Sequence, residues 1–105
     1  DINALTYGAG TNVDCSLAPV HTVTLTGNCD FRIDSLATGQ SVTIIITQDG
    51  SGSHTATFAE TDSTAVKFAG GAPTLTTAAN SIDVVTIFND GSSHLGNIAL
   101  DLKAS

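Results

Sequence analysis

The chain has 105 residues, a length that suits one domain, and only 12% of them are charged, about half of the ~25% that is usual in soluble domains. Ten acidic against three basic residues give a formal net charge of −7 at pH 7, which excludes the basic surface that binds nucleic acid or an anionic membrane. The longest apolar run, residues 44–46, is far shorter than the roughly 20 residues of a membrane helix. We therefore expect neither nucleic acid nor membrane as a partner, and the start at Asp1 suggests a processed or excised form.

The composition favours an all-β fold. Thr and Ser together make up 26 residues, whereas Lys, Arg and Glu, which commonly cover the wet face of a helix, total four. Thr can fill the wet face of a strand without loss of β-propensity.

Apolar and polar residues alternate with a period of two in segments separated by turn residues, the pattern of a sandwich or barrel. In chain order these segments are residues 2–7, 21–26, 29–34, 42–47, 54–58, 65–68, 82–89 and 95–102. We predict a jelly-roll-like sandwich of about eight strands in two antiparallel sheets. Within it, a hairpin with a loop at 26–28 would place Leu25 opposite Cys29 and Val23 opposite Phe31, unless the two strands belong to different sheets.

The first thirteen residues differ in character from the rest. Only Ile2, Leu5 and Tyr7 in them are suited to a core, and a Gly-Ala-Gly-Thr-Asn run follows at 8–12. The sequence thus predicts an N-terminal arm over 1–13 that lies across a partner, and a sandwich domain over 14–105.

Some apolar residues exceed what one small core can take. Ile45, Val85 and Ile87 lie in strands that are apolar at both parities, so we predict that they are buried at an interface between copies.

Cys15 and Cys29 are the only cysteines. A bridge between them would close a 15-residue loop and stabilise the fold by about 3 kcal/mol in the chain-entropy model. The inward parity of Cys29 equally suits a plain buried thiol, so both readings stay open. Two cysteines without a nearby pair of histidines match no zinc pattern, and we expect no metal and no cofactor.

Few residues suggest catalysis. Glu60 and Asp62 share one strand parity, as a glycosidase pair would, but a solvated strand edge explains them as well. No G-x-S-x-G nucleophile elbow occurs, and without Trp there is no obvious platform for a sugar ring. His21, His54 and His94 are far apart in the sequence, so satisfied or exposed side chains are the expectation. We predict that the protein is not an enzyme.

The order of the turn residues resembles a recurrent virion domain of tailed bacteriophages, found in tail or head fibres and in capsid decoration proteins. The blocks that carry the resemblance are TLTGN (24–28), GQ (39–40), QDG (48–50), GGAPTLT (70–76), DVV (83–85), DG (90–91) and Gly96. The resemblance covers roughly residues 22–98 and implies a β-sandwich that trimerises without enzymatic activity. This sequence departs from the pattern at His94-Leu95, where an aromatic residue is usual.

The main functional hypothesis is a trimeric capsid decoration (cement) protein that contacts the major capsid protein on the virion, with Ile2, Leu5 and Tyr7 in the contacting arm. The first alternative is the receptor-binding tip or a module of a tail or head fibre, whose partner is a host surface receptor or glycan. The second alternative is a carbohydrate-binding module.

Overall fold

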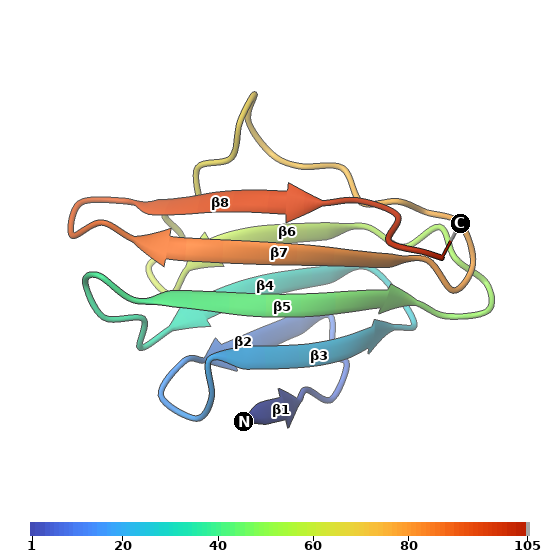
Figure 1. Ribbon diagram of the computed structural model, residues 1–105, viewed down its shortest axis with the longest axis horizontal. Coiled ribbons are helices and arrows are strands. Elements are labelled where there is room, and N and C mark those ends of the chain that lie inside the picture. The colour runs from blue at the N-terminus through green and yellow to red at the C-terminus, as the bar shows by residue number, and fades with distance from the viewer. Residues whose placement is uncertain (105) are drawn as a thin grey trace.

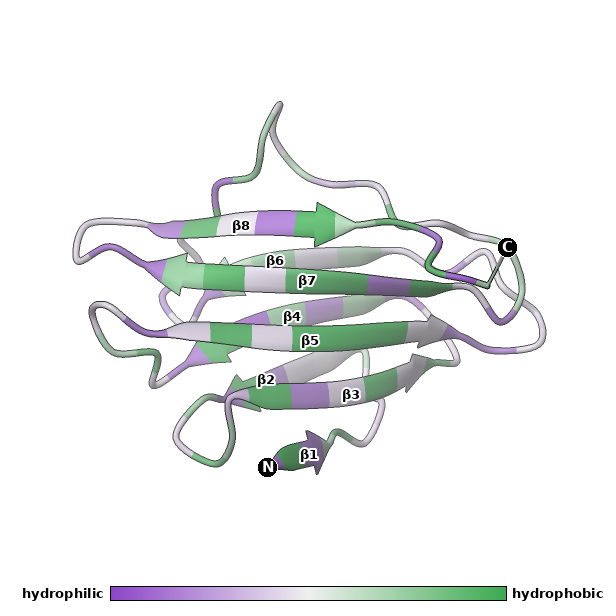
Figure 2. Ribbon diagram, in the orientation of Figure 1, coloured by the Kyte–Doolittle hydropathy of each residue, from purple (hydrophilic) through white to green (hydrophobic). Residues whose placement is uncertain are grey.

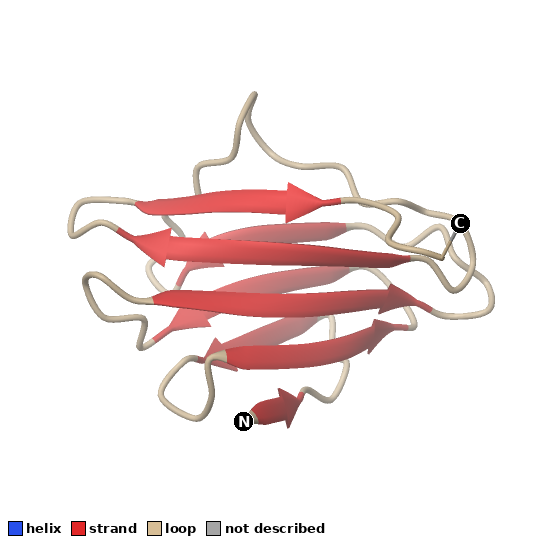
Figure 3. Cartoon of the chain, viewed as in Figure 1, coloured by secondary structure: helices blue, strands red, loops and turns tan. Residues whose placement is uncertain are grey.

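The computed structural model describes residues 1–104, which form two facing β-sheets without helices (Figure 3). The strands are β1 (Ile2–Ala4), β2 (Gly10–Asp14), β3 (Val20–Leu25), β4 (Cys29–Asp34), β5 (Ser41–Gln48), β6 (Ala56–Glu60), β7 (Ile82–Asn89) and β8 (His94–Ala99). The all-β prediction and the number of strands are confirmed. The described residues contain no helix and therefore no helical membrane span.

The first six strands wind between the two sheets in turn. The front layer in Figure 1 has the order β1-β3-β5-β7-β8, and the layer behind it has the order β2-β4-β6. Each odd strand is followed by an even strand in the opposite sheet, so β1, β3 and β5 run parallel, as do β2, β4 and β6. The chain therefore coils around the core, one pair of strands per turn.

Between the named strands, antiparallel pairing occurs only at the end of the described chain. A long segment, 61–81, returns from β6 to the front sheet, where β7 pairs antiparallel with β5 and β8 follows in a hairpin. The prediction of a plain antiparallel jelly roll was wrong in this respect: the front sheet is mixed and the back sheet is parallel. Alternation along a strand is the same in both pairings, which is why the sequence pattern could not separate them.

The predicted hairpin at 26–28 is absent. Leu25 ends β3 in the front sheet and Cys29 begins β4 in the back sheet, and the short link crosses between the layers. Leu25, Cys29, Val23 and Phe31 share the interior without being strand partners, because each faces the core from its own sheet.

The core lies between the sheets and is built from the inward residues of all strands except β1 and β8. In Figure 2 hydrophobic residues run along β5 and β7, the two longest strands. The most deeply buried apolar side chains are Phe31, Leu25, Ile44, Ile46, Ile87, Val13, Val42 and Val85. Phe31 stacks on Phe58 with ring centroids 5.3 Å apart, which joins two neighbouring strands of the back sheet.

The N-terminal residues belong to the sandwich and are not a separate arm. β1 adds to the edge of the front sheet beside β3, and β2 adds to the edge of the back sheet beside β4. Val13 is fully buried. Asn3 donates to Nδ1 of His21 at 3.1 Å, and the buried His21 ring also bonds the carbonyl of Ala18 at 3.0 Å. The predicted boundary at residue 13 therefore cuts through β2, and the prediction of an arm was wrong.

Candidate functional site

One open side of the sandwich is closed by residues 64–68, which we call the strap. Its first half pairs with the edge of β6. The amide of Glu60 donates to the carbonyl of Thr64 at 2.8 Å, and the amide of Val66 donates to the carbonyl of Phe58 at 3.2 Å. Val66 of the strap and Phe58 of β6 are both buried.

The second half of the strap crosses to the front sheet. The amide of Lys67 donates to the carbonyl of His94 at 2.9 Å, and the amide of Gly96 donates to the carbonyl of Lys67 at 2.8 Å. The next side chain, Phe68, lies over Gly96, where a Cβ atom would collide with the aromatic ring. The strap thus ties β6 and β8 together, although these strands belong to different sheets.

Beyond the strap the chain forms a projecting turn at Gly70 and Gly71, with φ angles of 76° and 102°. This left-handed backbone favours glycine. A cleft of about 570 Å³ lies between this turn and β6, a volume within the range of small-molecule sites. The lining residues are Asp30, Arg32, Thr57, Phe58, Ala59, Ala65, Val66, Lys67, Phe68, Gly71, Ala72 and Pro73.

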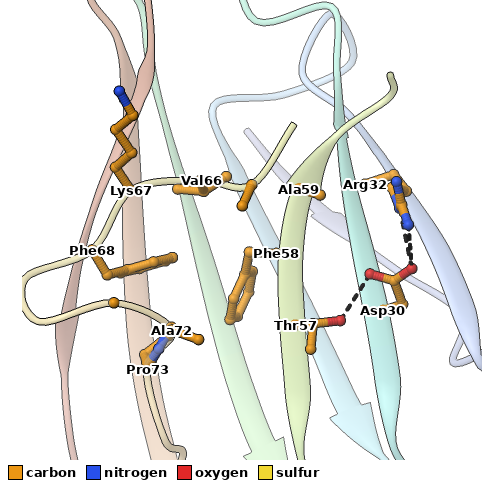
Figure 4. Close-up of a pocket in the computed structure, with 12 residues that line it drawn as sticks. Asp30, Arg32, Thr57, Phe58, Ala59, Val66, Lys67, Phe68, Ala72 and Pro73 are labelled. Atoms are coloured by element: carbon orange, nitrogen blue, oxygen red, sulfur yellow. Dashed lines mark hydrogen bonds and ion pairs between the residues drawn. The ribbon is translucent and has the colours of Figure 1, made fainter. Parts of the chain in front are cut away.

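One end of the cleft is polar (Figure 4). The Asp30 carboxylate accepts hydrogen bonds from Nη2 and Nε of Arg32 at 2.7 and 3.1 Å, and from the hydroxyl of Thr57 at 2.8 Å. Nη1 of Arg32 donates to the hydroxyl of Ser63 at 2.8 Å. The Arg32 side chain, followed by the Thr57 hydroxyl, holds the pKa of Asp30 below its usual value. Asp30 is therefore a charged acceptor held in a fixed position.

The other end of the cleft is apolar. The rings of Phe58 and Phe68 are tilted against each other, with centroids 5.5 Å apart. Ala72 and Pro73 face them from the returning chain (Figure 4). Phe68 and Pro73 are half-buried, so apolar surface remains open to a ligand. A cleft with an apolar wall and a few fixed polar groups is suited to binding.

Two of the chain's three cationic residues, Arg32 and Lys67, line this cleft. Arg32 is committed to Asp30, whereas the ammonium group of Lys67 points away from Phe68 in Figure 4 and donates to the hydroxyl of Ser93 at 3.0 Å. No free positive group projects into the cleft among the residues described. An uncharged ligand is consequently better suited to it than an anionic one.

None of the cleft residues was singled out as a site from the sequence. The Gly-Gly-Ala-Pro run at 70–73 by itself indicates only a bend, and Phe68 lies in residues 65–68, which the alternation predicts as a short strand. The signal for a cleft that the sequence offers is an aromatic residue, Phe68, followed by a Gly-Gly turn at 70–71. The polar end could not be recognised, because it joins β4 to β6 through parallel pairing.

Cys15 and Cys29 are free thiols in the structure, so of the two readings left open by the sequence it has the unbridged one. The amide of Cys15 donates to the carbonyl of Asp34 at one end of β4, whereas Cys29 occupies the other end. Five residues along a strand span about 17 Å, and a disulfide requires Cα atoms within about 7 Å. The Cys29 thiol instead contacts the hydroxyl of Thr11 at 3.4 Å.

The predicted interface residues divide between two environments. Val85 and Ile87 have no exposed surface and face the core, so they cannot contact another subunit and their assignment to an interface was wrong. Ile45 is half-buried and lies on the opposite, outer face of the front sheet. Its contact with another copy stays a prediction.

The residues predicted to contact a capsid are also part of the fold. Leu5 and Tyr7 pack against the core cluster, and the Tyr7 hydroxyl donates to the carbonyl of Asn28 at 2.8 Å. Ile2 is 66% exposed in the edge strand β1. Of the three, Ile2 exposes the largest fraction of its surface, whereas Leu5 and Tyr7 are half-buried.

The acidic pair and the histidines make local contacts. The carboxylate of Asp62 accepts from the amide of Thr64 at 3.0 Å, and Thr64 holds the pKa of Asp62 below its usual value. Glu60 lies 3.6 Å from Nδ1 of the buried His94. His54 contacts Asp49 at 3.0 Å. Within residues 1–104, no three His, Cys, Asp or Glu side chains are grouped as a metal site.

The comparisons with known proteins identify the chain through one family. The model of the family described as "Putative phage tail fibre C-terminal domain" matches residues 7–94, more than four fifths of the chain. Neither curated proteins nor solved structures gave a match. The prediction of a phage virion domain with a structural role is confirmed, and the match favours the fibre alternative over the capsid cement hypothesis. The chain belongs to the phage tail fibre C-terminal domain family.

Proposed function

We propose that this domain is a host-contacting module of a tail fibre that binds a surface receptor through the cleft beside β6. Membership of a tail fibre family supports the location of the domain in a tail fibre. The cleft supports the contact, and it is the observation that carries the proposal: an open apolar wall lies beside a charged acceptor held in place. In this proposal the module acts as a homotrimer on the virion and catalyses no reaction.

The receptor that fits the cleft best is an uncharged part of a host glycan. A carboxylate offers about four lone-pair positions, and Arg32 and Thr57 occupy three of those on Asp30. One acceptor position therefore remains for a sugar hydroxyl, and the Thr57 oxygen can accept another. The C–H face of a sugar ring can lie against Phe68 and Pro73, which take the place of the missing Trp.

Adsorption experiments test this function. The purified domain should compete with the phage for adsorption to its host cells. Ala72→Arg places a long side chain in the cleft from an exposed position and should weaken competition at least about tenfold, which corresponds to 1.4 kcal/mol. Ala69→Arg is the matched control, because Ala69 is exposed on the same loop but does not line the cleft.

Treatment of the host cells identifies the receptor class. Periodate, which cleaves sugar diols, should abolish binding, and protease should leave it intact. Loss of binding after protease alone would replace the glycan by a protein receptor. Equal competition by both arginine variants and the unaltered domain would show that the cleft is not the contact site.

A further inference from the structure

We propose that copies of this chain associate through the outer face of the five-stranded sheet. This inference deepens the homotrimer of the proposed function by assigning the surface that holds it together. The face consists of the outward positions of β1, β3, β5, β7 and β8, which the strand registers place side by side. Its outward apolar side chains include the partners Ile45 and Val84, Val20 and Ile82 at the starts of β3 and β7, and the partners Phe88 and Leu95.

The absence of charge distinguishes this face. The chain has thirteen charged residues, ten acidic and three basic, and none occupies an outward position of these five strands. Asp83, the one charged residue within them, faces inward and is buried. The outward positions carry Ile, Val, Leu, Phe, Ala, Thr, Ser and Asn only.

The outer face of the back sheet is the internal contrast. Asp14, Asp30 and Asp34 lie there with Arg32, at the alternate positions of β2 and β4 that point away from the core. A composition poor in charge therefore does not by itself explain the uncharged front face. Charge is present on one outer face of the sandwich and absent from the other.

The exposed apolar side chains point to the same surface. Phe88 and Leu95 are 40% and 42% exposed and are direct partners across β7 and β8. Ile2, 66% exposed, adds a further apolar side chain in β1 at the opposite edge of the sheet. Large exposed apolar side chains that gather on one face, here with Thr43, Thr86 and Asn97 between them, are typical of an interaction surface.

A second copy of the chain is the occupant that the charge distribution favours. Two copies with a net charge of −7 each repel one another wherever their acidic residues meet. On this face they meet without any like charge and without an unpaired ion to desolvate. Five strands about 4.8 Å apart and on average about six residues long give a face of about 24 by 20 Å. Three such faces turned toward a three-fold axis together present about 1,400 Å², which exceeds the ~1,000 Å² of a specific interface.

Sedimentation of wild-type protein and of two matched lysine variants tests the proposal. Thr86→Lys lies on the exposed centre of the face, and Asn12→Lys lies at an exposed outward position of the back sheet. We expect the wild type and Asn12→Lys to sediment as trimers of the 10.6 kDa chain, and Thr86→Lys to sediment as a monomer. Circular dichroism should show the same β-sheet spectrum for all three, and Ile45→Lys provides a second variant on the face.

Ionic strength provides an independent readout. An uncharged interface between acidic copies should hold equally well or better in about 1 M salt, because the salt screens only their repulsion. Dissociation by salt would overturn the proposal. A trimer that persists in both Thr86→Lys and Ile45→Lys would show that this face is not the interface, although the protein would still be a homotrimer. A wild type that remains monomeric at all concentrations would overturn both, and receptor binding by that monomer would still test the cleft separately.

Discussion

The aromatic ring of Phe68 rests directly on the backbone of Gly96, so closely that a Cβ atom at residue 96 would overlap three ring carbons. Phe68 ends the strap and Gly96 lies in β8, and a backbone hydrogen bond of 2.8 Å joins Gly96 to the residue before Phe68. Glycine at 96 is thus required by a close approach and not by an unusual backbone angle. The same contact positions the apolar wall of the cleft.

Replacement of this glycine should loosen the strap. Gly96→Ala forces the Phe68 ring away and should lower the free energy of unfolding by about 1–3 kcal/mol, the usual effect of overpacking. Chemical denaturation measures it. In a Phe68→Ala background the same change should have little effect, since the ring is gone. Gly10→Ala is the control, because its Cβ would meet open space, and an equal loss there would contradict the assigned cause.

The sequence allowed several strands to be predicted with their bounds. Residues 29–34 and 82–89 were predicted as strands and form β4 and β7. The residues of β2, Gly10–Asp14, have the composition of a turn and only Val13 as an apolar anchor, so pairing with β4 overrides their local preference. Residues 65–68 form isolated bridges instead of a strand, since they divide their backbone bonds between β6 and β8.

Topology and the cleft lay beyond local patterns. Short links such as residues 26–28 can close a hairpin or cross between sheets, and the residues themselves do not decide which. The cleft combines Asp30 of β4, Thr57 of β6 and Phe68 of the strap, which only the parallel arrangement brings together. The turn blocks that resemble phage proteins have clear structural roles. Gln48, for example, is buried and donates to the carbonyls of His54 and Thr76 at 2.7 and 3.1 Å.

The buried carboxylate of Asp83 should be important for stability. It accepts hydrogen bonds from the amides of Thr76 and Asp101 at 2.7 and 2.8 Å and so ties two loops to the start of β7. Asp83→Asn leaves one oxygen for two donors and should cost about 1–3 kcal/mol, measured by urea denaturation. Asp101→Asn removes only an exposed ion pair with Lys103 and should cost less than about 1 kcal/mol. Similar losses in the two variants would contradict this role.

The N-terminal residues should be needed for folding. Val13→Ala empties a fully buried position and should destabilise the domain by about 2 kcal/mol, as large-to-small core changes do. Deletion of residues 1–13 removes the first strand of both sheets and should yield a protein without cooperative thermal unfolding. A truncated domain with the melting curve of the full chain would instead support the prediction of a separate N-terminal arm. Asn12→Ala, at an exposed neighbouring position, is the control for Val13→Ala.

The Cys15 thiol should react slowly and with a steep dependence on pH. Burial, assisted by the negative charges of Asp14 and Asp34, raises the pKa of Cys15 to about 11, and the thiolate is the reactive form. At about pH 8 only about one thiol in a thousand is then ionised, against about one in ten for a pKa near 9. Alkylation of the folded protein, followed by mass spectrometry of the Cys15 peptide, should therefore speed up about tenfold per pH unit up to about 11.

The same raised pKa makes the free energy of unfolding depend on pH in the direction opposite to that of a salt-bridged carboxylate. The folded state keeps the Cys15 proton, which the unfolded state releases above about pH 9. Stability should fall as pH rises through this range. Full labelling of two thiols in denaturant is the control, and rapid labelling of native Cys15 near neutral pH, or a bond from it to Cys29, would contradict the assigned environment.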